Sequence, residues 1–83
     1  MDDKALYGLQ QELSELQVSL VRKRSEVSNL TVGYTRAEDG IGPIPAEPLK
    51  RNLMSARSEL VRMERRLAEI EALLAEARAR DGA

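Results

Sequence analysis

Several residue types that carry much of protein chemistry are missing from this chain. The 83 residues include no cysteine and no histidine, and the only aromatic residues are two tyrosines. The lack of cysteine excludes disulfides, a thiol nucleophile and thiolate metal ligands, and it fits a reducing cytoplasm. The lack of histidine removes the commonest general base. We therefore expect no enzymatic activity, no metal ion and no cofactor.

The shortage of aromatic residues also restricts the core. With 2% aromatic and 33% charged residues, the core must be built from Leu, Val, Ile, Met and Ala. This composition suits a thin helical seam better than a globule. No apolar run reaches about 18 residues, and the first residues are acidic. We expect a soluble protein, either cytoplasmic or incorporated in a virion or another assembly made in the cytoplasm.

The chain does contain a leucine-rich heptad repeat in each half, and the two repeats are mirror images. Seam positions alternately three and four residues apart run from Leu6 to Leu30 and from Leu53 to Ala77. Paired from the inside out, their residue numbers sum to 83, so that Leu30 faces Leu53 and Leu6 faces Ala77. Each pair sets an a position against a d position, as antiparallel helices require. The sequence predicts an all-α fold: one antiparallel coiled-coil hairpin in a single domain.

The same pattern sets the expected boundaries. Helix 1 should span about residues 3–31 and helix 2 about residues 47–80, with a tip at residues 32–47. Glycines and prolines in and beside the tip exclude a continuous helix. Asp39-Gly40 is typical of a turn, so the tip is either an ordered loop or a small β-hairpin pairing residues 31–35 with 41–44.

Apolar residues outside the seam indicate a surface for a partner. A lone hairpin leaves these side chains exposed to solvent. Their heptad spacing favours the interpretation as a partner surface over that of scattered apolar surface residues. A single hairpin buries only a strip, so we expect self-association into a larger helical bundle or insertion into a complex. The residues on the helices are Val18, Val21, Met54, Val61 and Ala68.

The tip extends this hypothesis with Tyr34, Ile41 and Ile44. Residues 32–47 are too rich in glycine and proline for a long hydrogen-bonded element, yet too apolar for a simple flexible linker. We expect the tip to be ordered by whatever packs on it. Tyr34 is the expected anchor, because tyrosine offers both contact area and a polar end.

Charged residues leave two alternatives open. Lys23 is the one polar residue of the seam, and it either fixes the register of the helices or is a tolerated defect. Basic residues near the tip form either a solvated surface or a patch for an acidic partner or a phosphate backbone. With a net charge of −1, a nucleic-acid partner is the weaker choice. The patch comprises Arg22, Lys23, Arg24, Lys50, Arg51 and Arg57.

The layout resembles that of two known families. A helical hairpin with Glu38 and Asp39 at its tip resembles the coiled-coil finger of bacterial transcript-cleavage factors, whose acidic tip enters the polymerase channel. The order helix, possible β-hairpin, helix is similar to the small head-to-tail joining proteins of tailed phages, which pack side by side in a ring. The first resemblance implies a regulator of an enzyme, and the second implies a structural subunit.

We therefore expect a structural, assembly or adaptor subunit that acts through coiled-coil contacts with other proteins. A phage particle or a similar bacterial machine is the expected setting. One alternative is a regulator that inserts its acidic tip into an enzyme such as RNA polymerase, and another is a weak nucleic-acid binder. Neither a small-molecule substrate nor a membrane partner is expected.

Overall fold

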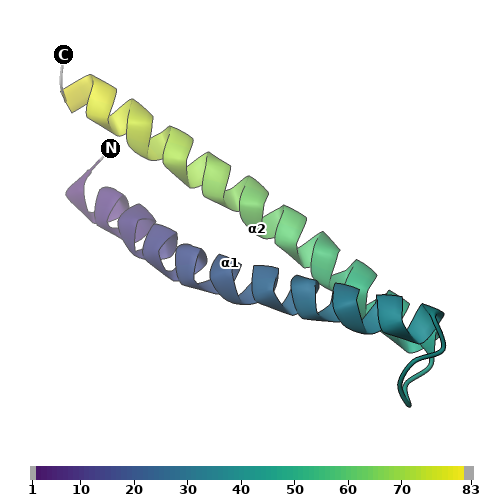
Figure 1. Cartoon of the computed structure of the whole chain (residues 1–83). Helices are drawn as coiled ribbons and strands as arrows, with labels where there is room; N and C mark the ends of the chain where they lie inside the picture. The colour runs from purple at the N-terminus through teal and green to yellow at the C-terminus, as the bar shows by residue number, and fades with distance from the viewer. Residues whose placement is uncertain (1, 82–83) are drawn as a thin grey trace.

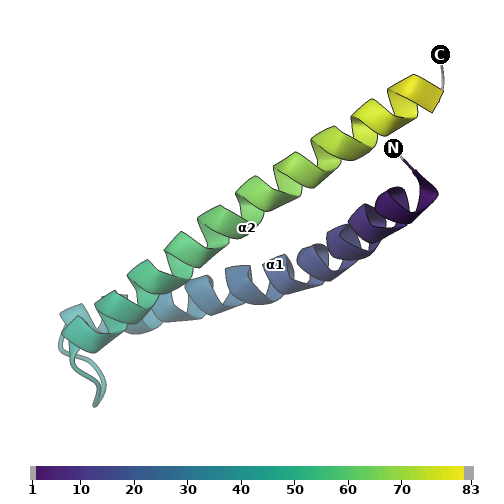
Figure 2. The ribbon, with the colours of Figure 1, turned by 180° about the vertical axis from the view of Figure 1, so that it is seen from behind.

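The computed structural model describes residues 2–81 as two long helices that run in opposite directions (Figure 1). Helix α1 spans Asp3–Glu38 and helix α2 spans Ala46–Asp81. No strand occurs in this part of the chain. The rod measures 60 × 16 × 14 Å, with both termini at one end and the connection at the other (Figure 2). The predicted all-α helical hairpin is confirmed.

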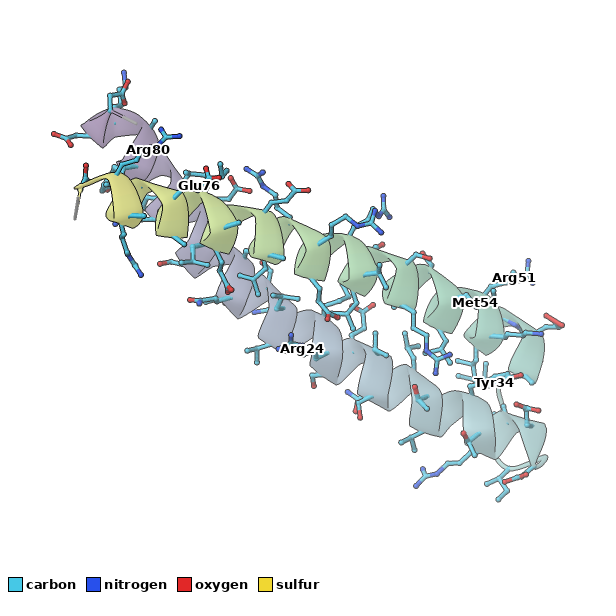
Figure 3. The ribbon with its side chains drawn as sticks, turned by 90° about the horizontal axis from the view of Figure 1, so that it is seen from above. Arg24, Tyr34, Arg51, Met54, Glu76 and Arg80 are labelled. Carbon is cyan, nitrogen blue, oxygen red and sulfur yellow. The ribbon has the colours of Figure 1, made fainter. Side chains whose placement is uncertain are left out.

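The two helices twist around each other along the rod. They overlap near the tip in Figure 1 and near the termini in Figure 3, which is turned by 90°. A seven-residue repeat imposes such a twist on helices with about 3.6 residues per turn. The twist keeps the a and d positions of each helix facing the other helix over the whole length.

The seam between the helices is built from the residues that the mirror heptads predict. Its best-covered large side chains are Leu20 and Ile70, which are 2% and 0% exposed. Most other seam positions are half-buried, as expected where only one helix covers another. The buried residues are Leu20, Leu53, Ala56, Ile70, Leu74 and Ala77.

Helix α1 ends at Glu38, about two turns beyond the predicted boundary at residue 31. The reason is that the heptad continues through Gly33, because a single glycine costs a helix only about 1 kcal/mol. The next two seam positions extend the rule that paired numbers sum to 83, and all four residues are half-buried. These pairs are Tyr34 with Leu49 and Ala37 with Ala46.

The tip is correspondingly short, at residues 39–45, and the alternative of a β-hairpin is wrong. Asp39-Gly40 ends α1 instead of turning between strands. Gly40 has a φ of 76° and donates its N–H to the Ala37 carbonyl at 3.1 Å, while the Ile41 N–H donates to the Arg36 carbonyl at 2.8 Å. This pair of bonds is a common helix C-cap, and it needs the positive φ that glycine adopts freely.

The outer ends of the helices are stabilised by local charges. The Asp2 carboxylate accepts a hydrogen bond from the Ala5 N–H at 2.7 Å, which caps the first turn of α1. Arg78 and Arg80 lie in the last turn of α2, where the partial charge of the helix end is negative. The hairpin therefore remains helical up to the end that carries both termini.

Candidate interaction surfaces

Lys23 enters the seam from α1, and two carboxylates hold its ammonium group. Nζ donates to Oε2 of Glu26 at 2.8 Å and to Oε2 of Glu59, on α2, at 2.6 Å. The Lys23 side chain is 18% exposed, so its stem lies along the seam while its charge reaches the flank. Hydrogen bonds to Glu26 and Glu59 raise the pKa of Lys23, and the bond from Lys23 lowers the pKa of Glu59.

This contact bears on the two alternatives for Lys23. Glu26 and Glu59 are like charges, and the ammonium group between them offsets their repulsion. The bond to Glu59 forms only when Lys23 and Glu59 lie at the same level of the rod. A polar seam residue with that property favours one register of the two helices over others.

A second ion pair joins the helices towards the termini. Arg66 donates from Nε and Nη2 to the two carboxylate oxygens of Glu12, at 2.6 and 2.8 Å, and from Nη1 to Glu69 at 3.1 Å. The two-pronged bond from Arg66 lowers the pKa of Glu12. Glu12, Glu26, Glu59 and Arg66 each precede an a residue, so all four occupy g positions. We call these four residues and Lys23 the charged flank of the hairpin.

On the outward side of α1 the b and f positions carry no charge from Tyr7 to Thr35, whereas the c positions include Glu15, Arg22 and Arg36. The b and f positions alternate by three and four residues, as the seam positions do. The nine side chains at these positions are all exposed, and the exposed fractions of Tyr7 and Val21 are 62% and 68%. We call this set the outer stripe: Tyr7, Gln11, Ser14, Val18, Val21, Ser25, Ser28, Val32 and Thr35.

The apolar residues predicted on α2 are also exposed. Met54 and Val61 are 59% and 54% exposed, and Ala68 is exposed as well. All three occupy b positions, and the b positions of two antiparallel helices lie on the same flank. Val21 and Val61 therefore lie at the same level of the rod, on one flank. The outward side of α2 differs from the outer stripe, because its f positions include Arg51 and Arg65.

The tip presents Ile41 and Ile44, which are 61% and 53% exposed. Tyr34, the expected anchor, instead lies in α1 as a half-buried seam residue, and Figure 3 shows both Tyr34 and Met54 towards the tip end of the rod. The nearby carboxylate of Glu38 raises the pKa of Tyr34. The two isoleucines border a hollow of about 180 Å³ whose wall also includes Leu49, which the sequence pattern did not single out.

The basic residues do not all lie on one surface, although three of them share a flank. Arg24, Lys50 and Arg57 occupy e positions on the flank opposite the charged flank. Arg22 lies at a c position on the other side of α1, and Lys23 is bound by two carboxylates. Figure 3 shows Arg24 along the middle of α1 and Arg51 near the tip end of α2.

No other kind of site emerges from residues 2–81. This part of the chain has no group of three or more acidic side chains that could hold a metal ion. Neither described helix is long and apolar enough to cross a membrane. Comparison with protein-family models, with curated proteins and with solved structures finds no match to the chain. The candidate functional sites of the hairpin are the exposed apolar surfaces described above.

Proposed function

We propose that this chain is a non-enzymatic assembly or adaptor subunit that binds other proteins through the faces of its helices. The outer stripe carries the proposal. A helix in a two-helix hairpin normally places charged residues at b, c and f, because water covers those positions. α1 instead leaves its b and f positions uncharged from Tyr7 to Thr35, in a chain that is 33% charged. Exposed apolar residues in such a register support a protein partner.

The shape of the rod supports the same conclusion. Ligand sites are concave and usually enclose about 300–1,000 Å³. The hollow beside Ile41 and Ile44, at about 180 Å³, is smaller and largely apolar. Long, shallow helix faces suit docking of other helices, which read contacts spaced three and four residues apart. We favour a component of a phage particle or a similar bacterial machine in which such hairpins pack side by side.

Affinity capture from the cells that make the protein tests this proposal. The wild-type chain is compared with Val61→Lys, which places a charge among the exposed apolar residues Met54, Val61 and Ala68, and with Glu76→Lys, which changes a charge at an exposed c position. We expect the wild-type chain to capture a defined set of other proteins, which is lost with Val61→Lys and kept with Glu76→Lys. Capture of the same proteins by all three chains would contradict a role for these apolar residues.

The tip provides the test of the alternative function. Replacing Glu38 and Asp39 together by alanine leaves Met54, Val61 and the outer stripe unchanged. We expect the captured complex to survive this change. A complex that survives Val61→Lys but is lost with Glu38→Ala and Asp39→Ala would favour the regulator that acts through an acidic tip.

A further inference from the structure

We propose that the outer stripe of α1 binds the outer stripe of a second copy of this chain, with the two α1 helices antiparallel. The twofold axis passes between Val18 and Val21. This inference rests on the proposed assembly function and names the partner of one of its surfaces. The two copies then form one layer of four helices, in the order α2, α1, α1, α2.

The first argument is that the stripe is self-complementary in one antiparallel register. When paired residue numbers sum to 39, every f position of one copy faces a b position of the other. Val18 then faces Val21 of the second copy, and Tyr7 faces Val32. The polar positions match as well, because Ser14 faces Ser25. Gln11 faces Ser28, so polar residues meet polar residues, while valines meet valines or Tyr7.

Neighbouring registers lose this match. A shift by one heptad in either direction sets Val18 opposite a serine, and sets Val21 opposite Ser25 or Gln11. The matched register extends from Tyr7 to Val32, which is roughly 38 Å of helix. Because all of these side chains are exposed in the hairpin, they are free to form the contact without unpacking the seam.

The second argument is charge. The part of α1 from residue 3 to residue 19 carries three acidic residues and one basic residue, whereas residues 20–38 carry four basic and two acidic residues. An antiparallel pair sets the acidic half of each copy against the basic half of the other. Glu15, beside the stripe, comes within two residues of the level of Arg22 of the second copy. A parallel pair would set Arg22 against Arg22, and like charges there oppose association.

The third argument is position. The b and f positions lie on the side of α1 that faces away from the a and d positions, so a second copy does not compete with α2. Valine and serine are smaller than the leucines of the seam, and they bury less apolar area per layer. We therefore expect a dimer in equilibrium with monomer, while Met54 and Val61 stay available to another partner.

Disulfide trapping tests the register, because the chain contains no cysteine of its own. Ser14→Cys and Ser25→Cys are prepared as separate full-length chains and oxidised alone and as a mixture. We expect the mixed disulfide to exceed both homodimers severalfold, since Ser14 faces Ser25 across the twofold axis. Ser55→Cys, at an exposed c position of α2, is the control and should not be trapped. A statistical ratio of the three dimers would overturn the register.

Sedimentation of the wild-type chain, Val21→Lys and Val61→Lys tests the surface. Because Val21 occurs twice in the interface, Val21→Lys should raise the dissociation constant of the dimer by roughly a hundredfold or more. Val61→Lys should leave the dimer intact. Circular dichroism confirms that each variant is helical, and Val21→Leu serves as the conservative variant that should still dimerise.

Two results would overturn the inference. One is a wild-type chain that sediments as a 9.3 kDa monomer at the highest attainable concentration. The other is a dimer that is lost with Val61→Lys but kept with Val21→Lys. A monomer that still captures a partner through Val61 would refute the second copy and leave the proposed assembly function standing, so the two failures are distinguishable.

Discussion

Helix α1 carries two stripes of residues with the same spacing, and α2 covers only one of them. The seam stripe is rich in leucine and includes Leu20, which is 2% exposed. The outer stripe consists mainly of valine and serine, and Val21 in it is 68% exposed. Spacing therefore indicates which residues share a face, while side-chain size indicates how strongly that face drives folding. Packing of the leucine stripe drives folding of the hairpin, whereas the stripe of valine and serine stays exposed and is available for a weaker contact.

The largest expected effect separates the two stripes directly. Ile70→Ala removes three carbons from a side chain that is 0% exposed, and we expect it to lower the free energy of unfolding by about 3 kcal/mol. Val21→Ala, in the outer stripe, should change it by no more than about 0.5 kcal/mol at a concentration where the chain is monomeric. Urea unfolding followed by circular dichroism measures both. Equal losses would mean that the outer stripe contributes to folding of the single chain.

A smaller effect tests where the seam stripe ends. Gly40→Ala places a side chain at a φ of 76° and should cost about 1 kcal/mol, because that conformation crowds the new Cβ. Gly33→Ala should instead stabilise the hairpin by about 1 kcal/mol, since Gly33 is inside α1 and its added Cβ meets nothing within 4 Å.

Thermal unfolding of the two variants should show midpoints that move in opposite directions. Gly8→Ala is the control, because Gly8 is also helical and open, and it should behave like Gly33→Ala. A loss of stability with Gly33→Ala would contradict a continuous helix through Tyr34 and Ala37.

Much of the seam was predictable from sequence because heptad spacing is local. The same rule, that paired residue numbers sum to 83, also extends the seam to Tyr34 and Ala37, which pair with Leu49 and Ala46. The boundary expected at residue 31 stops short of these pairs, because Gly33 begins a stretch whose glycines and prolines are typical of a helix break. The free energy gained by packing two further seam layers exceeds the cost of one glycine in the helix.

Other features depend on more than spacing. Asp39-Gly40 serves either a hairpin turn or a helix C-cap, since both use glycine with positive φ, and only the flanking elements decide. The contact of Lys23 with Glu59 depends on the reach of flexible side chains across a flank. Ser14, Ser25 and Ser28 are polar, so the apolar pattern that marks Val18 and Val21 as a surface does not include them.

An even smaller change in stability is expected for the serines of the outer stripe. Ser28→Ala replaces an exposed serine by the best helix former, and we expect a gain of up to about 0.5 kcal/mol in the monomer. Ser25→Ala should give a similar gain. Urea unfolding at low and at high protein concentration measures both gains. If the serines were already covered in the single chain by a hydrogen-bonded contact, the same changes would instead reduce stability.

The smallest expected effect concerns the charged flank that adjoins the seam. The pKa values of Glu12 and Glu59 in the folded chain lie below their ordinary value of 4.5, because each accepts hydrogen bonds from a cation. The stability that these pairs contribute is complete above that value and is lost as pH falls through the folded pKa values. The thermal midpoint should therefore decline on acidification below about pH 4.5.

Paired variants isolate this decline from general acid effects. Glu12→Gln and Glu59→Gln together should flatten the fall of the midpoint at acid pH, whereas Glu76→Gln should leave it as in the wild type. Glu76 forms none of the ion pairs found within residues 2–81. The difference should be modest, because Glu12, Glu59 and Arg66 are each more than 40% exposed, and it should shrink in high salt. A decline unchanged in the double variant would show that Glu12 and Glu59 do not cause the loss of stability in acid.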